Sequence, residues 1–448
     1  MTADAVAAGP APRERTAVDR LLRVFSDVRA GEGGTVLLMM LNLFLLMVGY
    51  YILKTVREPL ILVHGGAEMK AYAAAAQALT LMGFVPLYSW FSSRVDRMRL
   101  ITGVILFFLA CIELFYAGFL SRVPGLGFVF YVWVGIFSLA TIAQFWSYAN
   151  DLFDKPTGER LFPIVAVGAT AGSPLGALLT APLFKAGIHP YTMFQITAAL
   201  LLVHLALYRV VERRLAGRRA ASGASAPSQA KEPLAGPGGF ALILRNPYLQ
   251  LLAVLLLVLN IVNTTGEYLL GRTLLEASSA AATPEAKESV VGAFYGGYNF
   301  TTAVLALALQ MFVASRLVKY LGIGGVVLAL PLVSLGTYGV MASGVGLAVL
   351  RWAKIAENAT DYSIMNTARQ MLWLPTRREE KYKAKQAADT FVVRSGDMLS
   401  GLAVFIGTTF FALGVRGFAV MNLALGAVWL LVAIRLVRRY GSLSGPPA

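Results

Sequence analysis

The sequence has few of the residues that soluble enzymes and metal sites need. Only 14% of its 448 residues are charged and 57% are hydrophobic, far from the average of soluble globular proteins. A single cysteine, Cys111, excludes a disulfide within the chain and argues against a thiolate metal site. The three histidines, His64, His189 and His204, are scattered without metal-ligand spacing. We therefore expect no bound metal.

The common catalytic motifs are also missing. The chain has no His-Glu-x-x-His, no Gly-x4-Gly-Lys-Ser/Thr phosphate loop and no cysteine–histidine pairing. These absences argue against an enzyme and against a cofactor. Residues before Thr35 contain no apolar core of their own, so we expect no cleavable signal peptide.

Long apolar runs are what the chain has in abundance. A window of ~20 apolar residues, the length that crosses a bilayer, recurs from end to end. This predicts an all-α polytopic membrane protein with about twelve transmembrane helices. The expected spans lie near 35–62, 71–91, 100–120, 127–152, 161–184, 191–211, 247–271, 290–314, 322–342, 345–373, 388–413 and 417–437.

A segment rich in Ala, Gly, Ser, Pro and Arg divides these spans six and six. Two six-helix bundles joined by a cytoplasmic loop are the layout of the major facilitator architecture, and Asp96-Arg97-x-Arg99 resembles a loop motif of that superfamily. Ahead of the spans, residues 1–16 look disordered, and the apolar positions from Val18 to Val28 predict a short amphipathic helix. The expected domains are a cytoplasmic N-terminal segment with this helix (1–34), a first bundle (35–211), a linker (212–246), a second bundle (247–437) and a tail (438–448).

Basic residues predict the orientation in the membrane. With the N-terminus inside, the inner loops carry clusters of Arg and Lys, whereas the outer loops carry isolated cations such as Lys70. The positive-inside rule then predicts that both termini are cytoplasmic. We expect the chain to lie in the inner membrane of a bacterium, in contact with its lipid bilayer. The same rule explains the net charge of +15 without a nucleic-acid partner.

Charges lie within the first span. Lys54, Arg57 and Glu58 are followed by further apolar residues, and an ionisable group at membrane depth costs a few kcal/mol or more unless it is paired or hydrated. Lys54 and Glu58 are four residues apart and can partly neutralise each other, which leaves Arg57 over. The charges either reach the interface by snorkelling or form a cationic wall in a water-filled cavity. We favour the cavity.

Other spans carry polar residues at similar depth. Spacing predicts pairing of Lys354 with Glu357, with Asp361 on the face of Lys354, and puts Arg394 one turn from Asp397. Such groups hold many helix bundles together, but spans one, four, seven and ten, which line the cavity in the major facilitator arrangement, are among the most polar here. The polar positions are Gln144, Tyr148, Asn150 and Asp151 in span four; Asn260, Asn263 and Glu267 in span seven; Tyr295, Tyr298, Asn299 and Thr302 in span eight; Arg351, Lys354, Glu357, Asn358 and Asp361 in span ten; and Asp389, Arg394 and Asp397 in span eleven.

The cations suggest an anionic substrate, because Arg and Lys bind phosphate and carboxylate, and aromatic rings could stack on a base. The candidate substrate-binding residues are Lys54, Arg57, Tyr148, Asn150, Tyr298, Arg351, Lys354 and Arg394. The candidate coupling or gating residues are Glu58, Asp151, Glu267, Glu357, Asp361 and Asp397.

Gly168, Gly172 and Gly176, which are four residues apart, predict a face of close helix packing. We expect a monomer.

Three segments resemble the nucleotide transporter family of plastids and obligate intracellular bacteria, the ATP/ADP translocases. They are Tyr51–Leu60 with its Lys-x-x-Arg-acidic pattern, Phe145–Asp151 followed by Gly158–Ile164, and Pro375–Lys385 followed by Asp389, Arg394 and Gly396. The resemblance implies a major facilitator-like fold and nucleotide transport, in which Lys54 contacts substrate and Lys385, Asp389 and Arg394 form an entrance and gate.

The chain departs from that family at two charges. Val134 stands where a Glu is usual, and Asp397 follows Gly396 in place of Lys. Three functions therefore stay open. The first is a secondary transporter of a nucleotide or a related phosphorylated anion, for which exchange is one possible transport mode. The second is a carrier of an unrelated solute driven by protons through Glu267, Glu357 or Asp361. The third is a membrane component that transports nothing.

Overall fold

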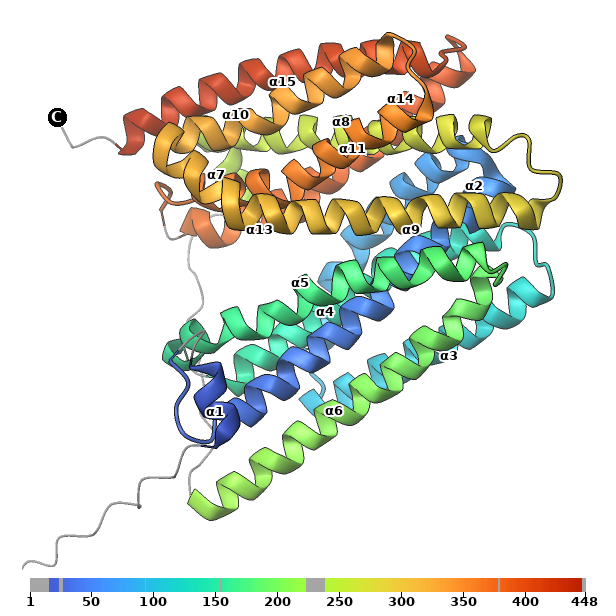
Figure 1. Ribbon diagram of the computed structural model, residues 1–448. Coiled ribbons are helices and arrows are strands. Elements are labelled where there is room, and N and C mark those ends of the chain that lie inside the picture. Colours follow the sequence, from blue (N-terminus) through green and yellow to red (C-terminus); the bar gives the residue numbers. More distant parts are fainter. Residues whose placement is uncertain are drawn as a thin grey trace, which may run out of the picture.

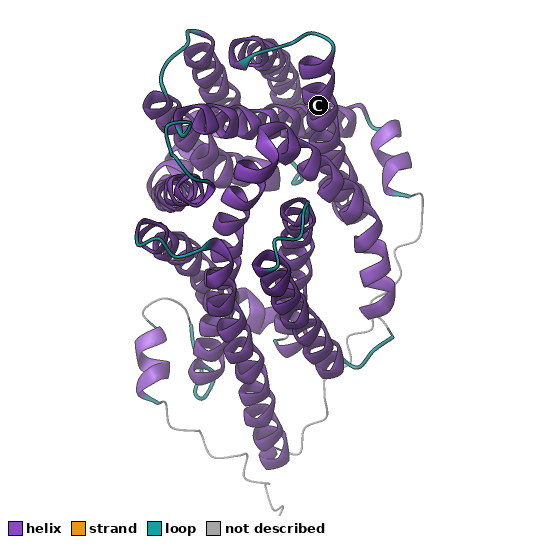
Figure 2. Ribbon diagram, turned by 90° about the vertical axis from the view of Figure 1, so that its right-hand side faces the viewer, coloured by secondary structure: helices purple, strands orange, loops and turns teal. Residues whose placement is uncertain are grey.

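Every regular element of the described chain is a helix (Figures 1 and 2). The computed structural model describes residues 16–23, 27–92, 94–153, 155–222, 238–377 and 379–444. The predicted disorder before Thr16, the middle of the linker (223–237) and the last four residues of the tail lie outside the described residues.

The first group of helices contains α1 to α6 (Figure 1, blue to green). Its elements are α1 (Ala17–Leu22), α2 (Gly33–Ser92), α3 (Arg97–Leu120), α4 (Leu126–Leu152), α5 (Lys155–Lys185), the short helix η1 (Pro190–Thr192) and α6 (Met193–Ser222).

The second group contains α7 to α15 (Figure 1, yellow-green to red). Its α-helices are α7 (Gly239–Arg245), α8 (Pro247–Ala277), α9 (Pro284–Ala308), α10 (Ser315–Ala342), α11 (Leu347–Thr360), α12 (Asn366–Met371), α13 (Lys385–Ala387), α14 (Val393–Thr409) and α15 (Val415–Ser444). Four π-helical segments lie between them: η2 (Leu309–Ala314), η3 (Asp361–Met365), η4 (Glu380–Ala384) and η5 (Ala388–Val392).

Nine long helical stretches of the described residues are apolar enough to cross a membrane. Two of them are about twice the usual length, and each is broken by a glycine with positive φ: Gly66 (φ 83°) in α2 and Gly322 (φ 60°) in α10. Splitting both, and adding the charged stretch from α11 to α12, gives the expected twelve. The all-helical, polytopic class is confirmed.

Two buried apolar clusters form the core. One is built from α1 to α6, and the other from α7 to α15 together with residues of α2 and α4 near the middle of the molecule. In Figure 1, α1 and the last turn of α15 lie at the same end, which we call the α1 end. The reversal within α2 and the one between α8 and α9 lie at the opposite end (Figure 1).

Glycines allow the closest helix contacts. A β-carbon on Gly168 or Gly172 would lie 2.2 or 2.5 Å from a backbone oxygen of α2, that of Met40 or Phe44. The predicted packing face of α5 is therefore confirmed, and α2 is its partner. A second small-residue contact joins the two groups, since a β-carbon on Gly296 of α9 would meet Thr180 and Ala181 of α5.

The N-terminal helix is shorter than its apolar pattern suggests. Helix α1 ends at Leu22 and residues 27–29 are not helical, so the extension to Val28 is wrong. Asp19 supplies the reason, because its buried carboxylate accepts hydrogen bonds from the backbone N–H groups of Gly31 (3.0 Å) and Gly33 (2.8 Å). The chain must turn back after α1 to reach them, and α1 is thereby fastened to the start of α2.

The predicted linker begins and ends in helix. Helix α6 continues to Ser222, and α7 lies inside residues 212–246. The Ala- and Arg-rich composition at the start of this segment is compatible with helix.

Candidate functional site

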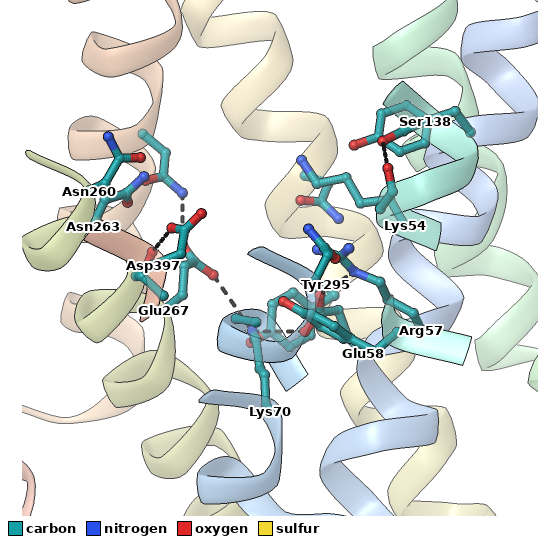
Figure 3. Close-up of a pocket in the computed structure, with 18 of the residues that line it drawn as sticks. Lys54, Arg57, Glu58, Lys70, Ser138, Asn260, Asn263, Glu267, Tyr295 and Asp397 are labelled. Atoms are coloured by element: carbon teal, nitrogen blue, oxygen red, sulfur yellow. Dashed lines mark hydrogen bonds and ion pairs between the residues drawn. The ribbon is translucent and has the colours of Figure 1, made fainter. Parts of the chain in front are cut away.

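A polar cavity of about 310 Å³ lies where the two groups of helices meet (Figure 3). The side chains that line it come from α2, α4, α8, α9, α11, η3 and α14. They include Tyr50, Lys54, Arg57, Glu58, Lys70, Gln77, Tyr131, Ser138, Asn260, Asn263, Thr264, Glu267, Tyr295, Tyr298, Asn299, Asn358, Tyr362, Arg394 and Asp397.

Glu58 lies between two cations. Its Oε1 is 3.1 Å from Arg57 Nε and its Oε2 is 2.7 Å from Lys70 Nζ. Lys70 also donates to the Tyr295 hydroxyl at 3.0 Å, which brings α9 into the cluster. The reversal at Gly66 folds the second part of α2 back against the first, so residues twelve apart in sequence meet here.

Glu267 of α8 lies between two lysines from different groups of helices. Its carboxylate is 3.7 Å from Lys70 Nζ and 3.9 Å from Lys354 Nζ, and Figure 3 shows Lys70 reaching toward both Glu267 and Glu58. Asn358 Nδ2 and the Tyr298 hydroxyl donate to it at 2.9 and 3.2 Å. Glu267 therefore connects the charges of α2 with those of α11.

Lys354 and Glu357 form a fully buried pair behind the cavity wall. Their Nζ and Oε2 atoms are 2.6 Å apart, which confirms the predicted pairing. Ser334 and Tyr338 of α10 donate to the same carboxylate at 2.7 and 3.2 Å. Because the two charges compensate each other and the carboxylate oxygens accept hydrogen bonds, we interpret this pair as structural and not as an open binding site.

Lys54 has different surroundings. Within the described residues, no carboxylate lies within 4.0 Å of its ammonium group. Its Nζ instead lies 4.9 Å from the ring centre of Tyr51 and 5.6 Å from that of Tyr362, at the distance of a cation–π contact. A positive charge faces the cavity with aromatic rings beside it.

Arg394 and Asp397 close the cavity on the side of α14. Arg394 donates to Asp397 at 3.3 Å, as their one-turn spacing suggests, and Thr264 of α8 donates to Asp397 at 2.7 Å. The guanidinium is therefore already engaged by a carboxylate.

Two expectations about the charged cluster are wrong. Glu58 pairs with Arg57 and Lys70, so Lys54, rather than Arg57, is the cation left over. Lys70 is not an outer-loop cation, because it is buried in the cavity wall with 4% of its surface exposed. Both errors come from treating 63–70 as a loop, whereas helix α2 turns sharply at Gly66 and continues at once.

The cavity includes seven of the predicted site residues and leaves others outside its lining. Those lining it are Lys54, Arg57, Glu58, Glu267, Tyr298, Arg394 and Asp397. Those outside are Tyr148, Asn150, Asp151, Arg351, Lys354, Glu357, Asp361, Lys385 and Asp389.

The outlying residues of α4 lie toward the α1 end. Asp151 is 3.5 Å from Arg97, whose guanidinium also contacts Glu212 at 3.0 Å and covers the ring of Tyr148. Asn150 is exposed. Arg97, which belongs to the Asp96-Arg97-x-Arg99 motif, thus connects α3 to α4 and α6. The polar face of α4 therefore contributes to helix packing at that end.

The remaining outlying residues belong to the second group of helices. Lys385 donates to Gln370 at 2.7 Å, Asp389 contacts Arg369 at 3.4 Å, and Arg351 lies over Phe294. Asp361 begins the π-helical segment η3, and its wider turn points side chains in other directions than a continuous α-helix would. Tyr362, rather than Asp361, faces the cavity.

Residues that sequence reasoning missed include Lys70, Gln77, Tyr131, Ser138, Thr264 and Tyr362. None carries a motif, and each becomes recognisable only when the rotation of its helix is known. No group of three or more His, Cys, Asp or Glu residues in the described ranges has the geometry of a metal site.

Comparison with known proteins finds sequence similarity to ATP/ADP transporters. The family model described as TLC ATP/ADP transporter matches residues 12–120. The ADP,ATP carrier protein 1 of Chlamydia trachomatis serovar D is 23% identical over 367 residues, which cover 72% of this chain and 67% of that carrier.

Solved structures show the same architecture. The nucleoside transporter NupG superposes with a TM-score of 0.63 at 13% identity and covers 91% of this chain and 99% of its own. A bacterial homologue of the iron transporter ferroportin, in an inward-facing state, has a TM-score of 0.62 at 14% identity over 90% of this chain and 98% of its own. These likenesses establish the fold, which is major facilitator-like, and leave the substrate open.

Proposed function

Because this chain is a distant member of the TLC ATP/ADP transporter family and a multi-pass membrane transporter, we propose that it carries a nucleotide or a related phosphorylated organic anion. The observation that carries this proposal is Lys54, a cation on a polar cavity wall that has no carboxylate partner within 4.0 Å in the described residues. A phosphate oxygen would supply the missing counter-charge.

The rest of the lining supports an organic anion over a bare ion. Five tyrosines and four asparagines line the cavity, besides Gln77 and Ser138. Amide and hydroxyl groups can both donate and accept hydrogen bonds, and aromatic faces can stack on a base. The similar protein of Chlamydia trachomatis is an ADP,ATP carrier, which favours a nucleotide within this class.

We propose that transport proceeds by alternating access and that the cavity faces the cytoplasm in this structure. The two groups of helices are tied together at the end opposite α1 by His64 with Glu288 (2.8 Å), Glu68 with Arg272 (3.4 Å) and Ser289 with Phe184 (2.5 Å). The basic clusters of the loops favour a cytoplasmic α1 end. Rocking of one bundle against the other around the cavity would then release these outer contacts.

A second candidate is a proton-coupled carrier of another small solute. It is favoured by one observation, which is that the partly exposed Glu267 carboxylate lies between Lys70 and Lys354 in the cavity wall. Protonation of Glu267 would weaken both contacts and so change how the two groups of helices are held together.

Ligand-dependent thermal unfolding of the purified full-length protein tests the proposal. A ligand at ~100 times its dissociation constant stabilises the folded state by roughly 2.7 kcal/mol. We expect a nucleotide to raise the melting temperature, Lys54→Ala to abolish that rise, and Lys319→Ala, which removes an exposed lysine away from the cavity, to leave it unchanged. A rise with an unrelated solute and none with any nucleotide would favour the proton-coupled carrier.

A further inference from the structure

The charges of the cavity wall nearly cancel. Four cations, Lys54, Arg57, Lys70 and Arg394, face three carboxylates, Glu58, Glu267 and Asp397. The lining therefore carries a net charge of plus one. The buried pair behind the wall, Lys354 with Glu357, adds nothing to this balance because its charges compensate each other at 2.6 Å.

Pairing leaves one cation for a ligand. Arg57 and Lys70 are held by Glu58, and Arg394 is held by Asp397. Arg351 also lacks a carboxylate within 4.0 Å in the described part of the chain, but it packs against Gly297 and Phe294 outside the lining. Removing a paired cation for a ligand would leave its buried carboxylate without a partner, which is costly.

Two uncharged side chains of the cavity wall, Asn358 and Gln77, present acceptor oxygens that favour a ligand with hydrogen-bond donors. Asn358 is 3% exposed, and its amide nitrogen donates to Glu267 and Tyr298, while its Oδ1 has no hydrogen-bond partner among the residues that the structure describes. The Oε1 atom of Gln77, on the same cavity wall, is likewise buried and accepts no hydrogen bond from the described part of the chain. Leaving such acceptors unsatisfied costs free energy, and sugar hydroxyls or the amino group of a base could satisfy them.

The size of the cavity favours a small ligand. Its volume of about 310 Å³ lies at the small end of the ~300–1,000 Å³ that ligand pockets occupy. A compact ligand with one charged group suits this space better than one with a phosphate chain.

We propose that the substrate carries a single phosphate monoester on a sugar or nucleoside, and that di- and triphosphates are disfavoured. A phosphate monoester carries about −1.5 to −2 charge at pH 7, and the lining's net charge of plus one, which already includes Lys54, offsets half or more of it. Each further phosphate adds negative charge for which the described residues of the wall hold no unpaired cation. This inference rests on the proposed function and specifies its substrate class.

Equilibrium binding to the full-length protein in nanodiscs tests it. The probes are AMP, UMP, ADP, ATP, adenosine and ribose 5-phosphate, each titrated by calorimetry at fixed ionic strength. We expect a monophosphate to bind at least ten-fold more tightly than adenosine and than either ADP or ATP. ADP or ATP binding as tightly as AMP would overturn this inference and leave the proposed function intact.

The sources of the phosphate are separated in the same titrations. Tight binding of AMP or UMP identifies a nucleotide, and tight binding of ribose 5-phosphate alone identifies a sugar phosphate; both support a single phosphate. Absence of binding by every phosphorylated probe would overturn both this inference and the proposed function.

A charge variant gives an independent readout. Asp397→Asn removes one carboxylate and frees Arg394, so the lining gains a second uncompensated cation. We expect the affinity for ADP relative to AMP to rise at least ten-fold, whereas Lys319→Ala leaves the ratio unchanged. An unchanged ratio in a folded Asp397→Asn protein would contradict the proposed charge limit.

Discussion

At the scale of single residues, Glu58 makes the two shortest carboxylate-to-cation contacts among the described residues that line the cavity. Its carboxylate is 4% exposed and is shared by Arg57 and Lys70. Glu58→Gln would leave two buried cations with too little compensation, so we expect the free energy of unfolding to fall by about 3 kcal/mol. Glu159→Gln, an exposed site on α5, serves as the control in the same denaturation experiment.

The loss in Glu58→Gln should be partly recovered by a second substitution. Lys70→Met removes one of the orphaned charges, so the double variant should be more stable than Glu58→Gln alone. Equal stability of Glu58→Gln and the wild-type chain would show that the buried cluster is not held by this carboxylate.

Asp19 fastens α1 to α2 through its charge. Burial raises the pKa of this carboxyl, but hydrogen bonds from the backbone of Gly31, Thr16 and Gly33 outweigh that effect and lower it from 3.8 to about 2. A lowered pKa means that the stabilisation is complete above pH 3.8 and is lost as the pH falls through about 2.

Asp19→Asn imitates the protonated state at neutral pH. We expect hydrogen exchange at the Gly31 and Gly33 amides to become at least ten-fold faster in the variant, while amides in the middle of α5 stay protected. Unchanged exchange at both glycines would contradict the proposed role of the carboxylate.

Residue pairs one turn apart were predictable from sequence, and pairs across a chain reversal were not. Lys354 with Glu357 and Arg394 with Asp397 follow from helical spacing alone. The contact between Glu58 and Lys70 depends on the backbone at Gly66, where no hydropathy pattern marks how sharply the chain turns.

At the scale of helices, the glycine face of α5 sets how closely α2 can approach. A β-carbon on Gly172 would lie 2.5 Å from the carbonyl oxygen of Phe44. Gly172→Leu should therefore force the helices apart and lower the free energy of unfolding by about 1–3 kcal/mol. Gly103→Leu is a matched control, because a β-carbon there meets nothing within 4 Å. Equal melting temperatures for the two variants would contradict this packing.

Helix number was predictable because a bilayer fixes span length. Helix rotation was harder to predict, and the prediction for α4 shows why. Its polar residues near Tyr148 bind Arg97 and pack at the α1 end, while Tyr131 and Ser138 reach the cavity. A polar face on a helix in a bundle can serve a neighbouring helix or a cavity equally well, and only the packing decides.

At the scale of the whole molecule, alternating access requires the contact between α5 and α9 to open. The two helices meet closely there, since a β-carbon on Gly296 would lie 3.0 Å from that of Ala181. In a Cys111→Ser background, Ala181→Cys combined with Gly296→Cys should form a disulfide after a small adjustment of the backbone.

Oxidation of this double variant should abolish transport in proteoliposomes, and a reductant should restore it. Each single-cysteine variant should be insensitive to oxidation. A cross-linked protein that still transports at the wild-type rate would show that this contact does not open during the cycle.

The most direct test of substrate transport is counterflow in proteoliposomes. Vesicles loaded with unlabelled AMP or ADP receive trace labelled nucleotide outside, with the wild-type chain, Lys54→Ala and Lys319→Ala compared at equal protein content. We predict accumulation of label by the wild-type chain and Lys319→Ala, and at least a ten-fold lower rate for Lys54→Ala. Equal uptake by Lys54→Ala, or no uptake of either nucleotide by the wild-type chain, would contradict nucleotide transport through the Lys54 cavity.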